Sequence, residues 1–406
     1  MRQAAWAWIA LGGCGGPGIW ALPADPPMPL DASVEAAVAA DLAALTLEEK
    51  AAMVAGTALI PTGEGWPAGG VSRLGIAPFR MTDGPRGVGL ADVATVFPVG
   101  IARAATWRPD LELAVGEAIG AEAAALGKDV LLAPTLNLVH HPRWGRSQES
   151  YGEEPIVLGS MAAAFLSGAG RHVMATAKHF AANSIEETRY DLDVRLDEAT
   201  LREVYLPHFR HAVRQGQPAW VMTAYNKVNG DYCGENRHLI TDILKGEWGF
   251  QGAVMSDWVW GLTDGAKALG AGLDLEMPVA DAMAGVAERV TSGEIDPARL
   301  DDAVRRLLRA RRAYDAVDRV TPSEAVVRSD AHLQLAREVA AASMVLLEND
   351  GVLPVAPGAR VAVVGRLSAL DNTGDRGSSN VPYADVVTPL AGLTDRFPET
   401  VAVPTD

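Results

Sequence analysis

Short apolar segments alternate with helix-like segments through the middle of this chain, and most of the apolar segments run into polar or charged residues. Short apolar runs of this kind are typical of strands that are buried on both faces of a parallel sheet. Amphipathic segments between them are typical of crossover helices. The alternation therefore predicts an α/β fold. The expected strands are residues 79–82, 130–134, 173–177, 220–224, 252–255 and one strand within 268–276.

Two architectures fit this alternation, a TIM-type (β/α)8-like barrel and a doubly wound open sheet. The open sheet predicts a Gly-rich phosphate-binding turn after its first strand. The only early G-x-G-x-x-G spacing, at Gly13, Gly15 and Gly18, lies in an expected targeting segment. Polar residues at several strand ends are typical of a barrel, where chemistry lies at the carboxyl ends of the strands. We therefore expect the barrel.

Helix signals support the segments between the strands. Thr46 and Glu49 form a capping-box pattern. Residues 109–126 have an apolar face, and Gly127 fits the end of that helix. A further helix is expected to begin after Asp296. Its apolar stripe consists of Leu300, Ala303, Val304, Leu307 and Leu308.

The length of 406 residues fits a large barrel followed by a second unit. We expect the barrel domain at residues 25–320, a linker at 321–335 and the start of a second α/β unit at 336–406. Within the last unit, residues 344–347, 352–355 and 361–364 are expected to be strands. Because ~70 residues is small for a domain with so many apolar strands, we expect this second unit to be truncated.

Residues 1–24 resemble a secretory signal segment. Arg2 precedes a Gly- and Pro-interrupted apolar stretch, and no second apolar segment follows, which favours a signal over a membrane span. The sequence around Cys14 is similar to a lipoprotein processing box, and we rank an anchor at Cys14 below simple secretion. The mature protein is expected to be secreted or periplasmic. Cys233 would then be the one remaining cysteine, so no disulfide framework is expected.

Charge and motif content exclude several functions. There are 51 acidic and 35 basic residues, for a net charge of −16. This balance disfavours nucleic acid and anionic membranes, because binding to phosphate groups needs a cationic face. No C-x-x-C or H-E-x-x-H pattern indicates a zinc site, and we expect no cofactor. A neutral small molecule is compatible with these features.

The segment from Gly252 to Trp258 is the most informative in the chain. Its apolar residues lead into Asp257, which is followed by Trp258. A carboxylate beside an aromatic ring suits a sugar site, because it can stabilise or attack a cationic anomeric carbon. The alternative is that Asp257 only caps the next helix.

Other strand ends carry both acids and bases, which suits a polyhydroxylated ligand that needs acceptors and donors. Lys178 and His179 form a tandem of two donors after one strand. Tyr225 either orients a carboxylate by hydrogen bonding or belongs to the core. The remaining strand-end groups are Asp83 with Arg86, Arg143 with Arg146, and Glu187 with Arg189.

Six segments, in the same order throughout, resemble glycoside hydrolase family 3, and its β-glucosidase-like subgroup most closely. The resemblance covers about residues 45–381. It implies a barrel followed by an α/β sandwich domain, incomplete here, with the site between the two. The six segments are residues 83–87, 142–153, 178–180, 224–230, 256–258 and 271–278.

The resemblance implies a retaining exo-β-glycosidase that hydrolyses terminal non-reducing β-D-glycosyl residues of oligosaccharides or of aryl and alkyl β-glycosides. Asp257 matches the nucleophile, and Tyr225 matches the tyrosine beside it. Basic neighbours would help to keep Asp257 ionised. Trp258 matches the aromatic residue on the aglycone side. The other expected substrate-binding residues are Asp83, Arg86, Arg146, Lys178 and His179.

The acid/base of this subgroup is a glutamate far along the second domain, and no residue of this chain matches it. The N-acetylglucosaminidase subgroup uses a His-Asp pair in the loop after its Lys-His, but residues 180–187 lack that pattern. A non-hydrolytic sugar-binding protein or an inactive truncated homologue is therefore an alternative. A metal-dependent hydrolase using His140, His141, His179 and Asp257 ranks last, because no H-x-H pair ends a strand.

Overall fold

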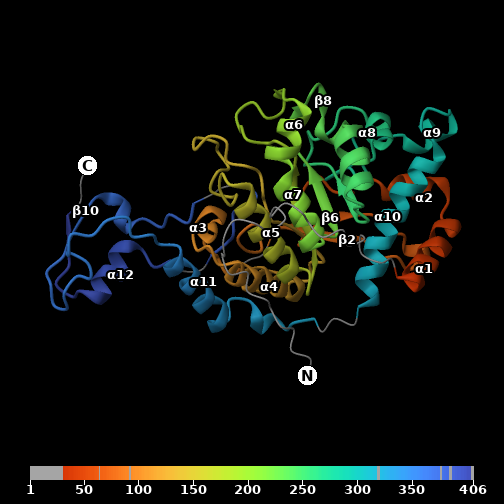
Figure 1. The fold of residues 1–406 in the computed structure, drawn as a ribbon. Helices are drawn as coiled ribbons and strands as arrows, with labels where there is room; N and C mark the ends of the chain where they lie inside the picture. Colours follow the sequence, from red (N-terminus) through yellow and green to blue (C-terminus); the bar gives the residue numbers. More distant parts are fainter. Residues whose placement is uncertain are drawn as a thin grey trace, which may run out of the picture.

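The computed structural model describes residues 31–63, 65–90, 93–317, 321–374, 377–383 and 386–403. The expected signal segment of residues 1–24 and Cys14 lie outside the described residues. Most of the described chain forms a strand barrel surrounded by helices, as Figure 1 shows. Within this part of the chain, no helix combines the length and the apolar character needed to cross a membrane.

The barrel is formed by a curled sheet of six strands, followed in space by two shorter bridging segments. Neighbouring strands are parallel except for β1 and β2, which are antiparallel. In spatial order the six are β1 (Trp66–Ala68), β2 (Phe79–Asp83), β3 (Val130–Leu132), β4 (Met174–Phe180), β6 (Trp220–Thr223) and β9 (Ala253–Met255).

Bridges between single residues continue the sheet from β9 back to β1. Leu275 pairs with Met255 of β9, Glu276 pairs with Ala55, and Gly56 pairs with Ala68 of β1. The fold is thus the TIM-like α/β barrel that the sequence predicts. The sequence around strand β1 predicts a loop, because the strand has only three residues and several glycines flank it.

The helices around the barrel bear out the sequence signals. In α2, the Thr46 hydroxyl accepts from the backbone N–H of Glu49, completing the capping box. Every residue of the apolar stripe of α10 is buried. The helices are α1 (Ala32–Ala44), α2 (Leu47–Met53), α3 (Gly100–Ala104), α4 (Pro109–Ala125), α5 (Pro155–Ala169), α6 (Glu198–Thr200), η2 (Leu201–Tyr205), α7 (Pro207–His211), η3 (Ala212–Gly216), η5 (His238–Glu247), α8 (Gly265–Ala271), α9 (Val286–Thr291) and α10 (Pro297–Ala316).

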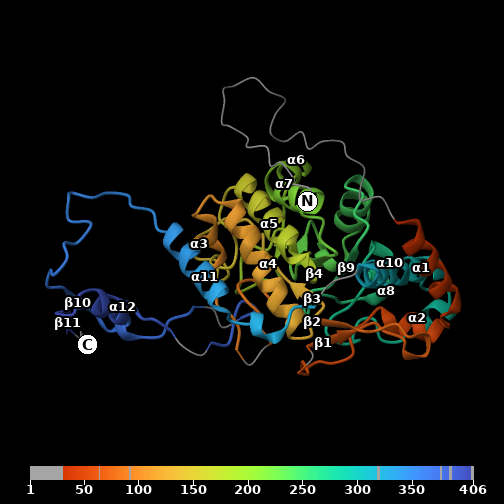
Figure 2. The same cartoon turned by 90° about the horizontal axis from the view of Figure 1, so that it is seen from below.

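After the barrel, helix α11 (Asp330–Ala342) lies against α4, and α4 packs on α5, as Figure 2 shows. Nδ1 of His332 in α11 lies 2.7 Å from the Glu122 carboxylate of α4. Because this pair joins the segment after the barrel to a barrel helix, α11 is held to the barrel surface.

Beyond α11 the chain forms a small peripheral unit in which β10 (Ala362–Val364) pairs in parallel with β11 (Val401–Val403), next to α12 (Pro389–Arg396). The expected strand at 361–364 is confirmed by β10. The strands expected at 344–347 and 352–355 are wrong. Leu347 is 92% exposed, and in the described part of the chain no strand pairs with either segment.

Candidate functional site

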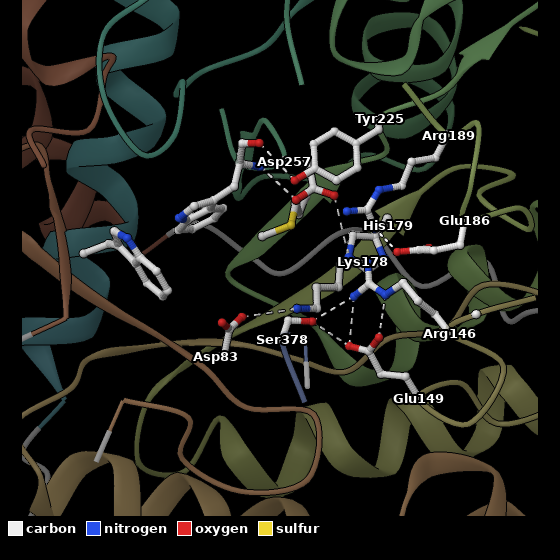
Figure 3. A pocket seen from close by; sticks show the side chains of 15 residues that line it. Asp83, Arg146, Glu149, Lys178, His179, Glu186, Arg189, Tyr225, Asp257 and Ser378 are labelled. Atoms are coloured by element: carbon white, nitrogen blue, oxygen red, sulfur yellow. Dashed lines mark hydrogen bonds and ion pairs between the residues drawn. The ribbon is translucent and has the colours of Figure 1, made fainter. Parts of the chain in front are cut away.

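A cavity of about 470 Å³ opens where the parallel strands of the barrel end, as Figure 3 shows. The polar residues expected at the strand ends meet here because the carboxyl ends of parallel strands share one rim. Its lining residues are Trp66, Asp83, Gly145, Arg146, Glu149, Lys178, His179, Glu186, Arg189, Met222, Tyr225, Asp257, Trp258, Gly377 and Ser378.

Asp257 follows β9 and lines this cavity. Its Oδ1 accepts a hydrogen bond from the backbone N–H of Trp258 at 2.8 Å. Its Oδ2 is buried and has no hydrogen-bond partner among the described residues. The residue that caps the next helix, α8, is Asp264 rather than Asp257. The helix-cap alternative for Asp257 is therefore wrong.

The pKa of the Asp257 carboxyl is raised above its ordinary value, and burial is the main cause. The charge of Arg146, the Trp258 N–H, the charge of Lys178 and the Tyr225 hydroxyl all act in the opposite direction. The basic neighbours favour the ionised form, as expected, but they offset only part of the desolvation. The Tyr225 hydroxyl also donates to the backbone oxygen of Trp258 at 2.9 Å, which ties the tyrosine to the turn that carries Asp257.

Arg146 and Glu149 form a buried bidentate ion pair in the loop after β3. The two hydrogen bonds measure 2.6 and 2.9 Å. Glu149 also accepts from the hydroxyls of Thr135 and Ser378. The pKa of Glu149 falls to about 2, because these interactions, led by the charge of Arg146, outweigh the effect of burial. Glu149 therefore carries a permanent charge that fixes Arg146 at the cavity wall.

Residues 377–383 return from the peripheral unit to the barrel, and two of them, Gly377 and Ser378, line the cavity. The Ser378 hydroxyl accepts from Arg146 at 2.8 Å. The backbone N–H of Ala94 donates to the carbonyl of Pro382 at 3.2 Å. Arg86, expected to bind substrate, lies outside the cavity lining and donates from Nε to the carbonyl of Ser379 at 2.9 Å. Arg86 thus fixes the backbone next to Ser378 from outside the cavity.

Asp83 and Lys178 face each other across the cavity at 3.7 Å. Burial raises the pKa of Asp83 to about 6, although the charge of Lys178 acts against the rise. This pair offers a carboxylate acceptor and an ammonium donor to a bound hydroxyl group.

His179 is neutral, and its cavity-facing nitrogen is an acceptor. Burial, with Arg146 and Lys178 nearby, lowers the pKa of His179 well below its usual value. The Asn137 amide donates to the His179 carbonyl and accepts from the His179 backbone N–H, which fixes its orientation. Its Oδ1 also lies 3.0 Å from His179 Nδ1, so Nδ1 carries the proton. Nε2, 3.8 Å from Asp257 Oδ2, is then a lone-pair acceptor. His179 thus presents an acceptor to the cavity rather than the second donor that the sequence predicts.

Arg189 forms the cavity wall beside Tyr225. Its guanidinium lies 4.7 Å from the centre of the Tyr225 ring and 4.9 Å from that of Tyr190. It pairs with Glu186 and not with Glu187, its expected neighbour, which is exposed. Arg143 is also exposed and lies outside the lining.

Seven lining residues are not predicted as site residues from the sequence, and four of these have polar or aromatic side chains: Trp66, Glu149, Glu186 and Ser378. Glu149 lies within the family-like segment 142–153, but Glu153 and Glu154 follow it closely, and no spacing rule distinguishes it from them. For the metal alternative, His140 and His141 are exposed. Over the residues that the structure describes, no group of three or more His, Cys, Asp or Glu side chains could hold a metal ion.

If Asp83 and Asp257 must be ionised for activity, their raised pKa values predict the pH below which activity is lost. An acid whose pKa is raised stays protonated to a higher pH, so kcat/KM should rise with pH through an inflection near pH 6 rather than near 4. If the site has the glycosidase activity that the sequence resemblance implies, a pH profile of kcat/KM on an uncharged glycoside measures this. Full activity persisting down to pH 4 would contradict it.

Residues 70–310 match the family described as "Glycosyl hydrolase family 3 N terminal domain". The thermostable beta-glucosidase B of Acetivibrio thermocellus is 39% identical over 83% of this chain and 45% of its own length. An exo-alpha-(1->6)-L-arabinopyranosidase of Bifidobacterium breve is 34% identical over 87% of this chain and 48% of its own length. The chain thus spans less than half the length of these relatives.

The structure of beta-glucosidase 3B from Thermotoga neapolitana in complex with glucose is similar in fold. It superposes with a TM-score of 0.84 at 33% identity, over 90% of this chain and 54% of that one. The similarity extends through most of the described residues, including the barrel that forms the cavity.

Proposed function

The chain belongs to glycosyl hydrolase family 3, and on that premise we propose that it is the nucleophile-bearing part of a retaining exo-β-glycosidase, β-glucosidase-like in specificity. The substrate would be a terminal non-reducing β-D-glycosyl residue on an oligosaccharide or on an aryl or alkyl aglycone. One observation supports this proposal more strongly than any other. The carboxylate of Asp257 lines a polar cavity, and its buried Oδ2 has no hydrogen-bond partner among the described residues.

In the proposed reaction, Asp257 Oδ2 attacks the anomeric carbon and forms a glycosyl ester. The bond from that carbon to the aglycone oxygen breaks, and the oxygen takes a proton from a general acid. Water then attacks the same carbon, gives a proton to the conjugate base of that acid, and releases Asp257 as a carboxylate. The two inversions at the anomeric carbon give net retention of its configuration. Retention is the stereochemical outcome at sites whose two carboxyl groups are ~5–5.5 Å apart.

The remaining polar groups would hold the sugar hydroxyls. Asp83 and His179 Nε2 would accept hydrogen bonds, while Lys178 and Arg146 would donate them. A pocket with both kinds of partner in fixed positions suits a ring that carries several hydroxyl groups. Trp258 would face the aglycone.

We infer that the general acid comes from outside the described cavity. Glu149 is held ionised by Arg146 and has a pKa of about 2, so it cannot supply a proton near neutral pH. Glu186 is paired with Arg189, and Asp83 with Lys178. The greater length of the relatives leaves room for a further domain that could carry the acid.

The test uses enzyme made from the complete reading frame that carries this sequence. It should hydrolyse a 4-nitrophenyl β-D-glucoside, and NMR during the first turnovers should show the β-anomer of the sugar before mutarotation. Release of the α-anomer first would refute retention. Sugar binding without turnover would favour the non-hydrolytic alternative.

We also propose that the protein is secreted or periplasmic, from the signal-like residues 1–24. An anchor at Cys14 is the alternative. Fractionation of the native host separates these cases, because a lipid-anchored protein stays with the membranes and a secreted one does not.

A further inference from the structure

We propose that Tyr190 and Trp260 form an outer binding site, beyond the cavity, for the second ring of an extended aglycone. This rests on the proposed function, because it assigns a place to the part of a substrate that lies farther from the scissile bond. The substrate class would be β-linked oligosaccharides of at least three sugar rings. A pyranose ring presents an apolar face of C–H groups, which packs on a flat aromatic surface.

The Trp260 side chain is 61% exposed, although it stands only three residues after Asp257. A large aromatic side chain gains most when it is buried, so its exposure beside a cavity is typical of a binding surface. Trp258, two residues earlier, already lines the cavity. The turn after β9 thus carries one aromatic residue at the cavity and one outside it.

A row of rings connects the cavity to Trp260. Tyr225 lines the cavity, and its ring centre lies 4.9 Å from that of Tyr190. The Tyr190 ring lies edge-on to Trp260, with 5.2 Å between the centres. Arg189 donates to the Tyr190 hydroxyl at 2.7 Å and fixes its position. The rings are therefore in continuous edge-to-face contact from Tyr225 to Trp260, and Tyr190 supports the exposed Trp260 ring.

The backbone holds Trp260 in a fixed position relative to Asp257. Val259 has a φ of +65°, an unfavourable conformation for a β-branched residue. Its N–H donates to the carbonyl of Met277 at 3.0 Å, and the Trp260 N–H donates to the carbonyl of Trp258 at 2.7 Å. A Cβ at Gly261 would lie 2.6 Å from the carbonyl oxygen of Asp257. Such a strained and closely packed turn presents Trp260 as a rigid platform.

The experiment compares Trp260→Ala and Trp260→Phe with the wild type in enzyme made from the complete reading frame. Cellotriose and 4-nitrophenyl β-D-glucoside share a glycone, but only the first has a second aglycone ring. We expect Trp260→Ala to lower kcat/KM for cellotriose about five- to tenfold and for the nitrophenyl glucoside less than about twofold. Trp260→Phe should keep most of the cellotriose activity.

The matched control is Trp107→Ala, since Trp107 is 74% exposed and lies in the turn between α3 and α4. It should leave kcat/KM unchanged on both substrates. Equal losses on both substrates in Trp260→Ala, or no loss on either, would overturn the outer site while leaving the proposed function intact. If the wild type hydrolyses neither substrate, it is the proposed function that fails.

Discussion

Asp257→Ala is expected to lower kcat on an activated aryl β-glucoside by roughly 10⁴-fold or more while leaving the fold intact. The substitution removes one hydrogen bond, from the Trp258 N–H to Oδ1, whereas the Oδ2 atom that would bond to the anomeric carbon has no hydrogen-bond partner among the described residues. The substitution also removes a charged group whose burial is unfavourable, and this burial is the main cause of the raised pKa of Asp257. Steady-state kinetics and a circular dichroism spectrum measure the two effects.

A second readout separates a missing nucleophile from general damage to the site. Azide is small enough to enter the space left by the carboxylate, and its attack on the anomeric carbon should restore turnover and give the α-glycosyl azide. Asp242→Asn, on the exposed side of η5, is the matched control and should keep wild-type activity. Unchanged turnover in Asp257→Ala would refute the assignment.

Glu149→Gln is expected to lower the free energy of unfolding by about 3 kcal/mol at pH 7. The pKa of Glu149 falls from 4.5 to about 2 in the folded protein, so its charge stabilises the fold above pH 4.5. This contribution is lost as the pH falls from about 4.5 towards 2. The substitution also leaves the buried Arg146 guanidinium without its ion-pair partner, which is costly.

Urea denaturation at pH 7 measures this difference. Glu153→Gln, in the same loop but exposed, is the matched control and should change stability by less than about 0.5 kcal/mol. Because Arg146 and Ser378 both depend on Glu149, kcat/KM should fall as well. Equal stability of the two variants would show that the Arg146–Glu149 pair does not stabilise this fold.

The barrel and most of the cavity follow from sequence because they depend on local patterns. Buried strands have recognisable apolar runs, and a parallel barrel brings their carboxyl ends to one rim. Asp83, Lys178, Tyr225 and Asp257 are therefore expected together and do lie together. Strand β1 is too short and too rich in flanking glycine to give such a pattern.

Contacts that depend on the path of long loops do not follow from sequence. Ser378 reaches the cavity only because residues 377–383 return to the barrel far along the chain. The acceptor role of His179 depends on Asn137, which comes from a different loop. The pairing of Arg189 with Glu186 rather than Glu187 depends on which of two adjacent glutamates turns inward. Residue spacing carries no information on these three points.

Covalent trapping of the nucleophile tests the central claim most directly. A 2-deoxy-2-fluoro-β-D-glucoside with an activated leaving group forms its glycosyl ester faster than water can release it. Mass spectrometry of the digested enzyme should find one 2-fluoroglucosyl group per chain, on the peptide that contains Asp257, and none in Asp257→Ala. Hydrolysis of ordinary glucosides with no label, or with the label on another residue, would contradict the account.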